Sequence, residues 1–111
     1  MHKMNLQSKY FNYILNGTKK IELRLLDEKR KLINIGDTIE FTNEKSNETF
    51  KVLVTNLYKY DTFENLFKDF DISILADSSM TKKELIDVLE KFYTKEKQNT
   101  YGVVGIEVKL I

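Results

Sequence analysis

A helical pattern gives way to a strand pattern within Gly17-Thr18-Lys19-Lys20-Ile21-Glu22-Leu23-Arg24, and this junction decides the fold. Before it, apolar residues at helical spacing follow Ser8, an N-cap candidate, and the glycine stands where a helix over about 9–16 would end. From Ile21 the apolar residues alternate with polar ones, which predicts a strand over about 20–25. Charges therefore gather on one face of this strand, at Lys20, Glu22 and Arg24.

The remaining patterns predict three more strands and two more helices. Alternating apolar residues favour strands near 38–42, 50–58 and 102–110. Asp61 and Glu64 resemble a capping box, which indicates a short helix after Asp61. Thr81 and Glu84 form a second capping box, and an amphipathic helix near 82–94 follows it. No linker or repeat divides the chain, so we expect an α+β fold in one domain over residues 1–111.

Composition excludes several classes of chemistry. The chain has no cysteine and one histidine, His2, in a terminal segment that we expect to fray, so thiol chemistry, disulfides and a histidine-rich zinc site are unsupported. None of its four glycines forms a phosphate-binding loop. We therefore expect no metal and no cofactor. No apolar run is long enough to span a bilayer and no secretory pattern opens the chain, which predicts a cytoplasmic protein without a membrane partner.

The spacing GxKxxExR, formed by Gly17, Lys19, Glu22 and Arg24, resembles the signature of the ASCH domain, a PUA-like family associated with RNA. The segments 35–41 and 101–108 are similar to a turn into a barrel strand and to the closing strand of that family. The resemblance implies a PUA-like small β-barrel with flanking helices and a cleft beside the signature strand. It also implies that the cleft is walled by Lys19, Glu22 and Arg24.

Strand geometry raises a question about Lys19. In an ideal strand its side chain shares a face with Ile21 and Leu23, not with Glu22 and Arg24. Either strand pairing begins after Lys19, or a bulge turns its side chain toward the other two charges.

The interpretation we favour is a module that binds RNA or a nucleotide-like small molecule. Arg24 offers a planar fork of donors for a phosphate or a base edge, and Glu22 can orient that fork or accept from an exocyclic amine. Basic residues outnumber acidic ones over 18–31, which provides a patch for phosphates. Tyr101 could stack a base. The expected ligand-binding residues are Gly17, Lys19, Lys20, Glu22, Arg24 and Tyr101.

Each of these residues can also be explained by a structural role that involves no ligand. Charges on one strand face can form a solvated ladder of ion pairs, each contributing only about 0 to 1 kcal/mol. A tyrosine at the start of a strand most often packs its ring and hydrates its hydroxyl, and Lys29, Arg30 and Lys31 can be a solvated loop. A structural or regulatory domain without a ligand also stays open.

The alternative function is a small metal-independent hydrolase, an amidohydrolase of a modified nucleoside or a ribonuclease, using Lys19 and Glu22 as catalytic residues. ASCH-like amidohydrolases that act on acetylated cytidine use a lysine, a threonine and a glutamate. The lysine matches Lys19, but Glu22 occupies the threonine position and 77–79 is Asp-Ser-Ser near the glutamate position. We also expect Glu22 to keep Lys19 protonated, and therefore predict little or no release of acetate.

Overall fold

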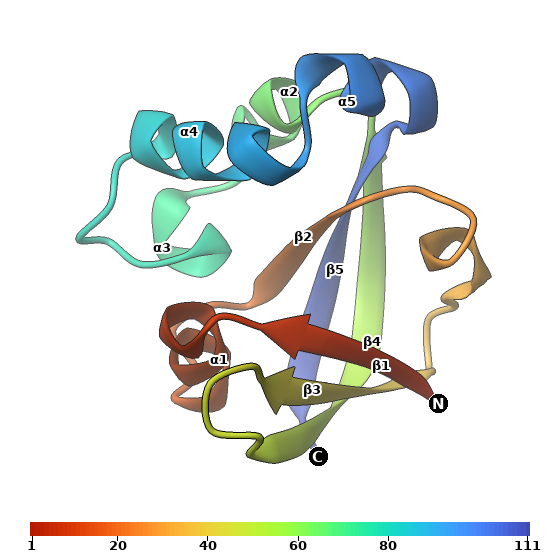
Figure 1. The fold of residues 1–111 in the computed structure, drawn as a ribbon, viewed down its shortest axis with the longest axis vertical. Coiled ribbons are helices and arrows are strands. Elements are labelled where there is room, and N and C mark those ends of the chain that lie inside the picture. Colours follow the sequence, from red (N-terminus) through yellow and green to blue (C-terminus); the bar gives the residue numbers. More distant parts are fainter.

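A computed structural model describes all 111 residues and contains five strands, five α-helices and one 3₁₀ turn (Figure 1). The strands are β1 (His2–Leu6), β2 (Ile21–Leu25), β3 (Thr38–Asn43), β4 (Thr49–Tyr60) and β5 (Val103–Leu110). The helices are α1 (Ser8–Leu15), α2 (Phe63–Phe67), α3 (Ile72–Leu75), α4 (Lys82–Phe92) and α5 (Lys95–Tyr101), and the 3₁₀ turn is η1 (Arg30–Leu32). None of these helices has the length and apolar character needed to cross a bilayer.

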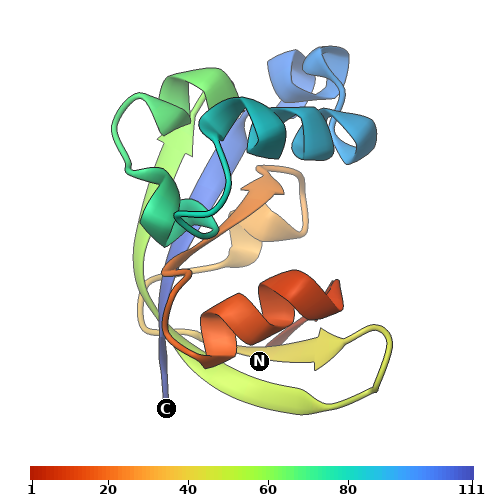
Figure 2. The same cartoon turned by 90° about the vertical axis from the view of Figure 1, so that its left-hand side faces the viewer.

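The five strands form one strongly curled sheet in the order β1-β3-β4-β5-β2. β1 runs parallel to β3, and the other neighbours are antiparallel. β4 pairs with both β3 and β5, and an irregularity between Val54 and Asn56 interrupts its register with β5. Helices α2 to α5 cover one end of this half-barrel, while α1 lies at the other end (Figures 1 and 2). The α+β class with a curled sheet and flanking helices is confirmed.

Two apolar cores lie on the two faces of β2 and β5. The inner core of the half-barrel includes Phe11, Phe41 and Ile106, and the second core joins Ile21, Leu23 and Leu25 to helices α2, α3 and α4. Antiparallel pairing sets Glu22 opposite Ile106 and Arg24 opposite Val104. Directly paired residues share a face, so the two charged side chains point toward the inner core rather than into solvent.

The first strand is a correction to the sequence analysis. We expected the segment around His2 to fray, but β1 pairs in parallel with β3, and His2 Nε2 lies 2.9 Å from Asp37 Oδ2. Met4 and Leu6 are buried in the inner core. The pairing partner lies more than thirty residues away along the chain, so no local pattern announces this strand.

Helix boundaries follow the predicted signals only in part. The glycine stop is confirmed, because Gly17 adopts φ 84° directly after α1. Ser8 is not the N-cap: that position is Gln7, and the Ser8 hydroxyl instead donates to Asn43 Oδ1. Asp61 does not cap α2 either, because Thr62 does. The capping box of α4 is confirmed at Thr81 and Glu84.

The segment before the last strand also differs from expectation. The helix predicted near 82–94 ends at Phe92, and a separate helix, α5, follows it. Tyr101 is therefore the last residue of α5 rather than the first residue of a strand. Gly102 separates the two elements with φ 75°, a backbone conformation that favours glycine.

Candidate functional site

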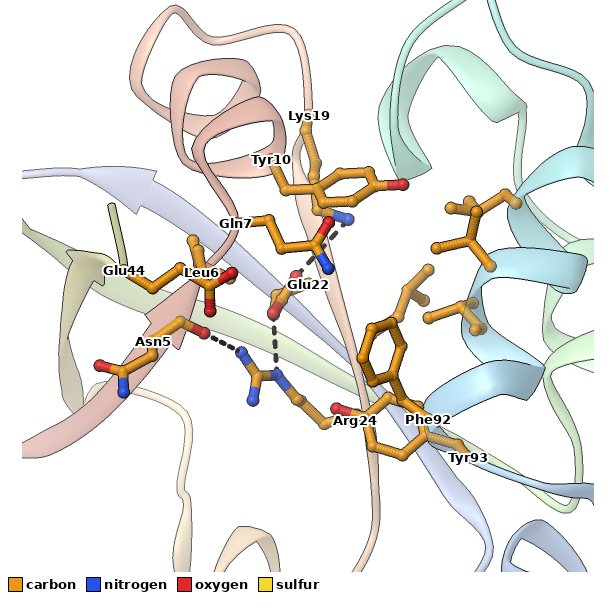
Figure 3. A pocket seen from close by; sticks show the side chains of 14 residues that line it. Asn5, Leu6, Gln7, Tyr10, Lys19, Glu22, Arg24, Glu44, Phe92 and Tyr93 are labelled. Carbon is orange, nitrogen blue, oxygen red and sulfur yellow. Dashed lines mark hydrogen bonds and ion pairs between the residues drawn. The ribbon is translucent and has the colours of Figure 1, made fainter. Parts of the chain in front are cut away.

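A pocket of about 190 Å³ opens where β2 passes between the end of β1, the start of α1 and the helix α4 (Figure 3). One of its walls is polar and the other is largely apolar. The lining residues are Asn5, Leu6, Gln7, Tyr10, Lys19, Glu22, Leu23, Arg24, Glu44, Leu85, Val88, Leu89, Phe92 and Tyr93.

The polar wall contains a chain of three charged residues. The side chain of Lys19 reaches to within 3.6 Å of Glu22 Oε1, measured from Nζ. Glu22 Oε2 accepts a hydrogen bond of 2.8 Å from Arg24 Nε, and Arg24 Nη2 donates one of 2.8 Å to the carbonyl oxygen of Asn5 (Figure 3). β2 begins at Ile21, so strand pairing starts after Lys19, and the question of its orientation is resolved without a bulge.

All three charged side chains are largely removed from solvent. Their exposed fractions are 2% for Lys19, 8% for Glu22 and 12% for Arg24. A solvated ladder of surface ion pairs is therefore excluded. Burying such groups is costly unless they are paired, and the two cations here share one carboxylate.

The buried position of Lys19 changes its acidity. Burial lowers the pKa of the Lys19 ammonium from 10.5 to about 8, and Arg24 acts in the same direction against the attraction of Glu22. Desolvation therefore outweighs the attraction of Glu22, contrary to the balance we expected, because the fold removes Lys19 almost completely from water. With a pKa of about 8 the ammonium is still mostly protonated at neutral pH.

The other two charges keep their ionised forms. Burial by itself would raise the pKa of Glu22, but Arg24 and Lys19 together hold it below the usual value of a glutamate. Burial would lower the pKa of Arg24, but Glu22 and Tyr93 raise it. The pocket thus contains a stable carboxylate–guanidinium pair beside an ammonium that titrates in an accessible pH range.

Some polar atoms of this cluster remain available to a ligand. Two protons of the Lys19 ammonium are donated to the carbonyl oxygens of Ile21 and Leu75. Glu22 Oε1 faces the Lys19 ammonium at 3.6 Å and has acceptor capacity left, and Arg24 Nη1 takes part in neither of the bonds described above. The site can therefore both accept a hydrogen bond at Glu22 and donate one from Arg24.

The opposite wall comes from α4 and from the residue that ends it. Leu85, Val88 and Leu89 lie one turn apart on a single helix face, and Phe92 and Tyr93 extend this face at the mouth of the pocket. Phe92 is 54% exposed, and its ring centroid lies 6.4 Å from that of Tyr93. Tyr10 stands across from them, with its ring centroid 5.9 Å from Lys19 Nζ (Figure 3).

Three predicted ligand-binding residues do not line the pocket: Gly17, Lys20 and Tyr101. Gly17 ends α1, Lys20 is exposed, and Tyr101 ends α5. The basic loop at 29–31 also lies outside the pocket. Arg30 forms an ion pair with Asp27, and Lys31 forms one with Glu28.

Sequence reasoning missed most of the other lining residues. Asn5 and Gln7 belong to the segment that we expected to fray, and Tyr10 was passed over within the pattern of the first helix. Phe92 fits the apolar spacing of α4, but spacing does not tell which element a helix faces. No group of three or more histidine, cysteine or carboxylate side chains lies close enough together to hold a metal ion.

Several solved structures share the fold of this chain. The hypothetical protein PH0355, known from a crystal structure, is 36% identical over 98% of this chain and 97% of its own, with a TM-score of 0.87. PF0455 from Pyrococcus furiosus is 34% identical over 99% and 96%, with a TM-score of 0.79.

An ASCH domain from Lactobacillus crispatus shares the fold at 16% identity, with a TM-score of 0.68 over 98% of this chain and 78% of its own. No curated protein matches. The ASCH domain description matches residues 4–111, and the chain belongs to the ASCH domain family.

Proposed function

We propose that the pocket binds a nucleoside-like small molecule through a base that carries an exocyclic amine. The observation that supports this most directly is the ionised carboxylate of Glu22, which lines the pocket next to the guanidinium of Arg24. A carboxylate has about four acceptor positions, so Glu22 can accept a further hydrogen bond beside its two cations. A base with an exocyclic amine next to a ring acceptor could donate a hydrogen bond to Glu22 and accept one from Arg24 at the same time.

The shape of the pocket supports a single base rather than a large ligand. Its volume of about 190 Å³ is below the roughly 300 to 1,000 Å³ of pockets that enclose drug-sized molecules. The wall formed by Leu89, Phe92 and Tyr93 offers apolar surface to the flat face of a ring. These features favour a pyrimidine over a strand of RNA.

The charges around the pocket also support a small ligand. The basic residues that would follow a phosphate backbone are engaged elsewhere, since Arg30 pairs with Asp27 and Lys31 with Glu28. Within the pocket the only cations are Lys19 and Arg24, and both are bonded to protein acceptors. The lining of the pocket therefore offers no track of free cations of the kind that polyanion binding requires.

The test compares cytidine with uridine by isothermal titration calorimetry. Cytidine has an exocyclic amine next to an acceptor nitrogen, whereas uridine has a carbonyl at the amine position and its N–H donor one ring atom away. A pocket that fits the amine against Glu22 and the ring nitrogen against Arg24 is therefore expected to bind cytidine at least about tenfold more tightly. Phe92→Ala should weaken binding because it removes stacking surface from an exposed position. Tyr101→Ala, a second exposed aromatic outside the pocket, is the matched control.

Equal affinity for cytidine and uridine would contradict the role of Glu22. Weakening by Tyr101→Ala but not by Phe92→Ala would place the ligand outside this pocket. A short single-stranded RNA that binds while both nucleosides fail would replace the small-molecule proposal by RNA binding.

A second candidate, hydrolysis of an acylated nucleoside, is favoured by one observation. Lys19 lines the pocket beside Glu22, and once it has lost a proton its amine is a base that can act on a ligand bound there. Its pKa of about 8 makes that form accessible. However, Asp77 and Ser79 bond to each other and do not line the pocket, so no third catalytic group follows from the family pattern.

Acetate release from acetylated cytidine separates the two functions. We expect binding without appreciable turnover. Turnover by the wild-type protein clearly above that of Lys19→Met, with a rate that rises through about pH 8, would instead establish the hydrolase.

A further inference from the structure

The carboxylate of Glu44 stands at the mouth of the pocket without a charged partner. Glu44 follows the last residue of β3 and lines the pocket from the side of β1, opposite α4 (Figure 3). It takes part in none of the six ion pairs of the protein. The side chain is exposed, so its negative charge is present at the entrance whether or not a ligand is bound.

The backbone holds Glu44 firmly in this place. Its N–H donates a hydrogen bond of 2.9 Å to the carbonyl oxygen of Leu6, which ties the end of β3 to the end of β1. The preceding residue, Asn43, is 5% exposed, and its Oδ1 accepts from the Ser8 hydroxyl at 2.9 Å and from the Lys45 N–H at 3.0 Å. A buried side chain with several partners thus fixes the turn that carries the carboxylate.

The cations of the pocket cannot offset this charge for an incoming anion. Lys19 donates to two backbone carbonyls and lies beside Glu22, while Arg24 donates to Glu22 and to Asn5. A phosphate at the entrance would meet the free carboxylate of Glu44 and only part of one guanidinium. An uncharged sugar would meet the same carboxylate as a hydrogen-bond acceptor for its hydroxyl groups.

We infer that Glu44 is a specificity-determining residue that makes the pocket select a free nucleoside over the corresponding nucleoside monophosphate. The inference rests on the proposed function, and it adds a reason for the ligand to be unphosphorylated. The repulsion is electrostatic and acts through solvent, so it weakens as salt shortens the screening length.

The experiment measures the dissociation constants of cytidine and cytidine 5′-monophosphate by calorimetry, at about 0.01 M and at about 0.15 M salt, where the screening length falls from about 30 Å to about 8 Å. For Glu44→Gln we expect monophosphate binding to strengthen about threefold or more at low salt, with cytidine binding changed by less than about twofold. The control is Glu48→Gln, which removes the same charge from the same turn outside the pocket. It should leave the ratio of the two constants unchanged.

The outcomes separate this inference from the proposed function. If cytidine binds but the ratio of the two constants is the same in the wild type and in Glu44→Gln, only the role of Glu44 is overturned. An equal shift in Glu44→Gln and Glu48→Gln would mean that net charge decides, which also overturns it. If neither ligand binds to any variant, the proposed function fails and the role of Glu44 fails with it.

Discussion

The buried environment of Lys19 lowers the pKa of its ammonium group, although Glu22 lies beside it. Its side chain is 2% exposed and its ammonium lies between a carboxylate, a guanidinium and two backbone carbonyls. Attraction to Glu22 favours the charged form, but removal from water disfavours it more. The pKa is consequently lowered to about 8, so the protonation of one residue links the stability of the fold to pH.

The first prediction concerns stability against pH. Between about pH 8 and 10.5 the folded chain has released the Lys19 proton while the unfolded chain still binds it. The unfolded state then binds more protons, so the free energy of unfolding rises with pH in this window, by roughly 2 to 3 kcal/mol. Urea denaturation at pH 7.5 and pH 10 should show this rise for the wild type and not for Lys19→Met.

Groups far from Lys19 that titrate in the same window contribute alike to both proteins, so the difference between the two pH profiles reports on Lys19 and its immediate neighbours. Tyr10, whose pKa is raised by burial, Tyr13 and Glu22, is one of these neighbours. Parallel pH profiles for the wild type and Lys19→Met would show that the pKa of Lys19 is not lowered in the folded state.

At the scale of elements, α4 is the helix on which the apolar wall of the pocket depends. Thr81 Oγ1 accepts from the Glu84 N–H at 3.1 Å, and Glu84 Oε1 accepts from the Thr81 N–H at 3.1 Å. These reciprocal bonds satisfy backbone donors that the first turn of a helix leaves free. The box therefore fixes where α4 begins, one turn before Leu85 enters the second core.

The second prediction is that Thr81→Ala lowers the free energy of unfolding by about 1 kcal/mol, because the Glu84 N–H loses its acceptor. Thr81→Ser keeps a hydroxyl at the same position and should restore most of the loss. Chemical denaturation of the three proteins checks this. A loss of the same size in Thr81→Ser would mean that the methyl group of Thr81, and not its hydroxyl, stabilises the helix.

At the scale of the whole molecule, the curled sheet leaves β1 and β2 as its two edges. These edge strands are connected through a side chain, because Arg24 of β2 donates to the carbonyl oxygen of Asn5 in β1. The same guanidinium is held by Glu22. The pocket lies at this junction, so the bond that joins the two edges also shapes the site.

The third prediction is that Arg24→Met increases amide hydrogen exchange in β1 about tenfold relative to β4 and β5. The reason is that β1 then loses its hydrogen bond to β2, although it keeps its pairing with β3 and the burial of Met4 and Leu6, and one hydrogen bond to a charged group corresponds to about 1.5 kcal/mol. Mass spectrometry of exchanged peptides measures the effect. Lys20→Met, which removes an exposed cation next to β2, is the control, and uniform acceleration in all strands would refute a local role.

The sequence by itself determined the elements whose signals are local. The alternation from Ile21 to Leu25 specified a strand, Gly17 ended the helix before it, and Thr81 with Glu84 marked the start of α4. The spacing of Gly17, Lys19, Glu22 and Arg24 also led to the family. Each of these features depends on neighbours within a few residues, where backbone geometry and side-chain period act directly.

The tertiary structure alone decided which surfaces meet. Pairing of β2 with β5 turned Glu22 and Arg24 toward the inner core, although alternation would equally fit a solvated face. Pairing of β1 with β3 ordered the segment of Asn5, and packing of α4 brought Phe92 to the pocket. These contacts join residues far apart in the chain, and their energy comes from burial and long-range pairing, which no local pattern encodes.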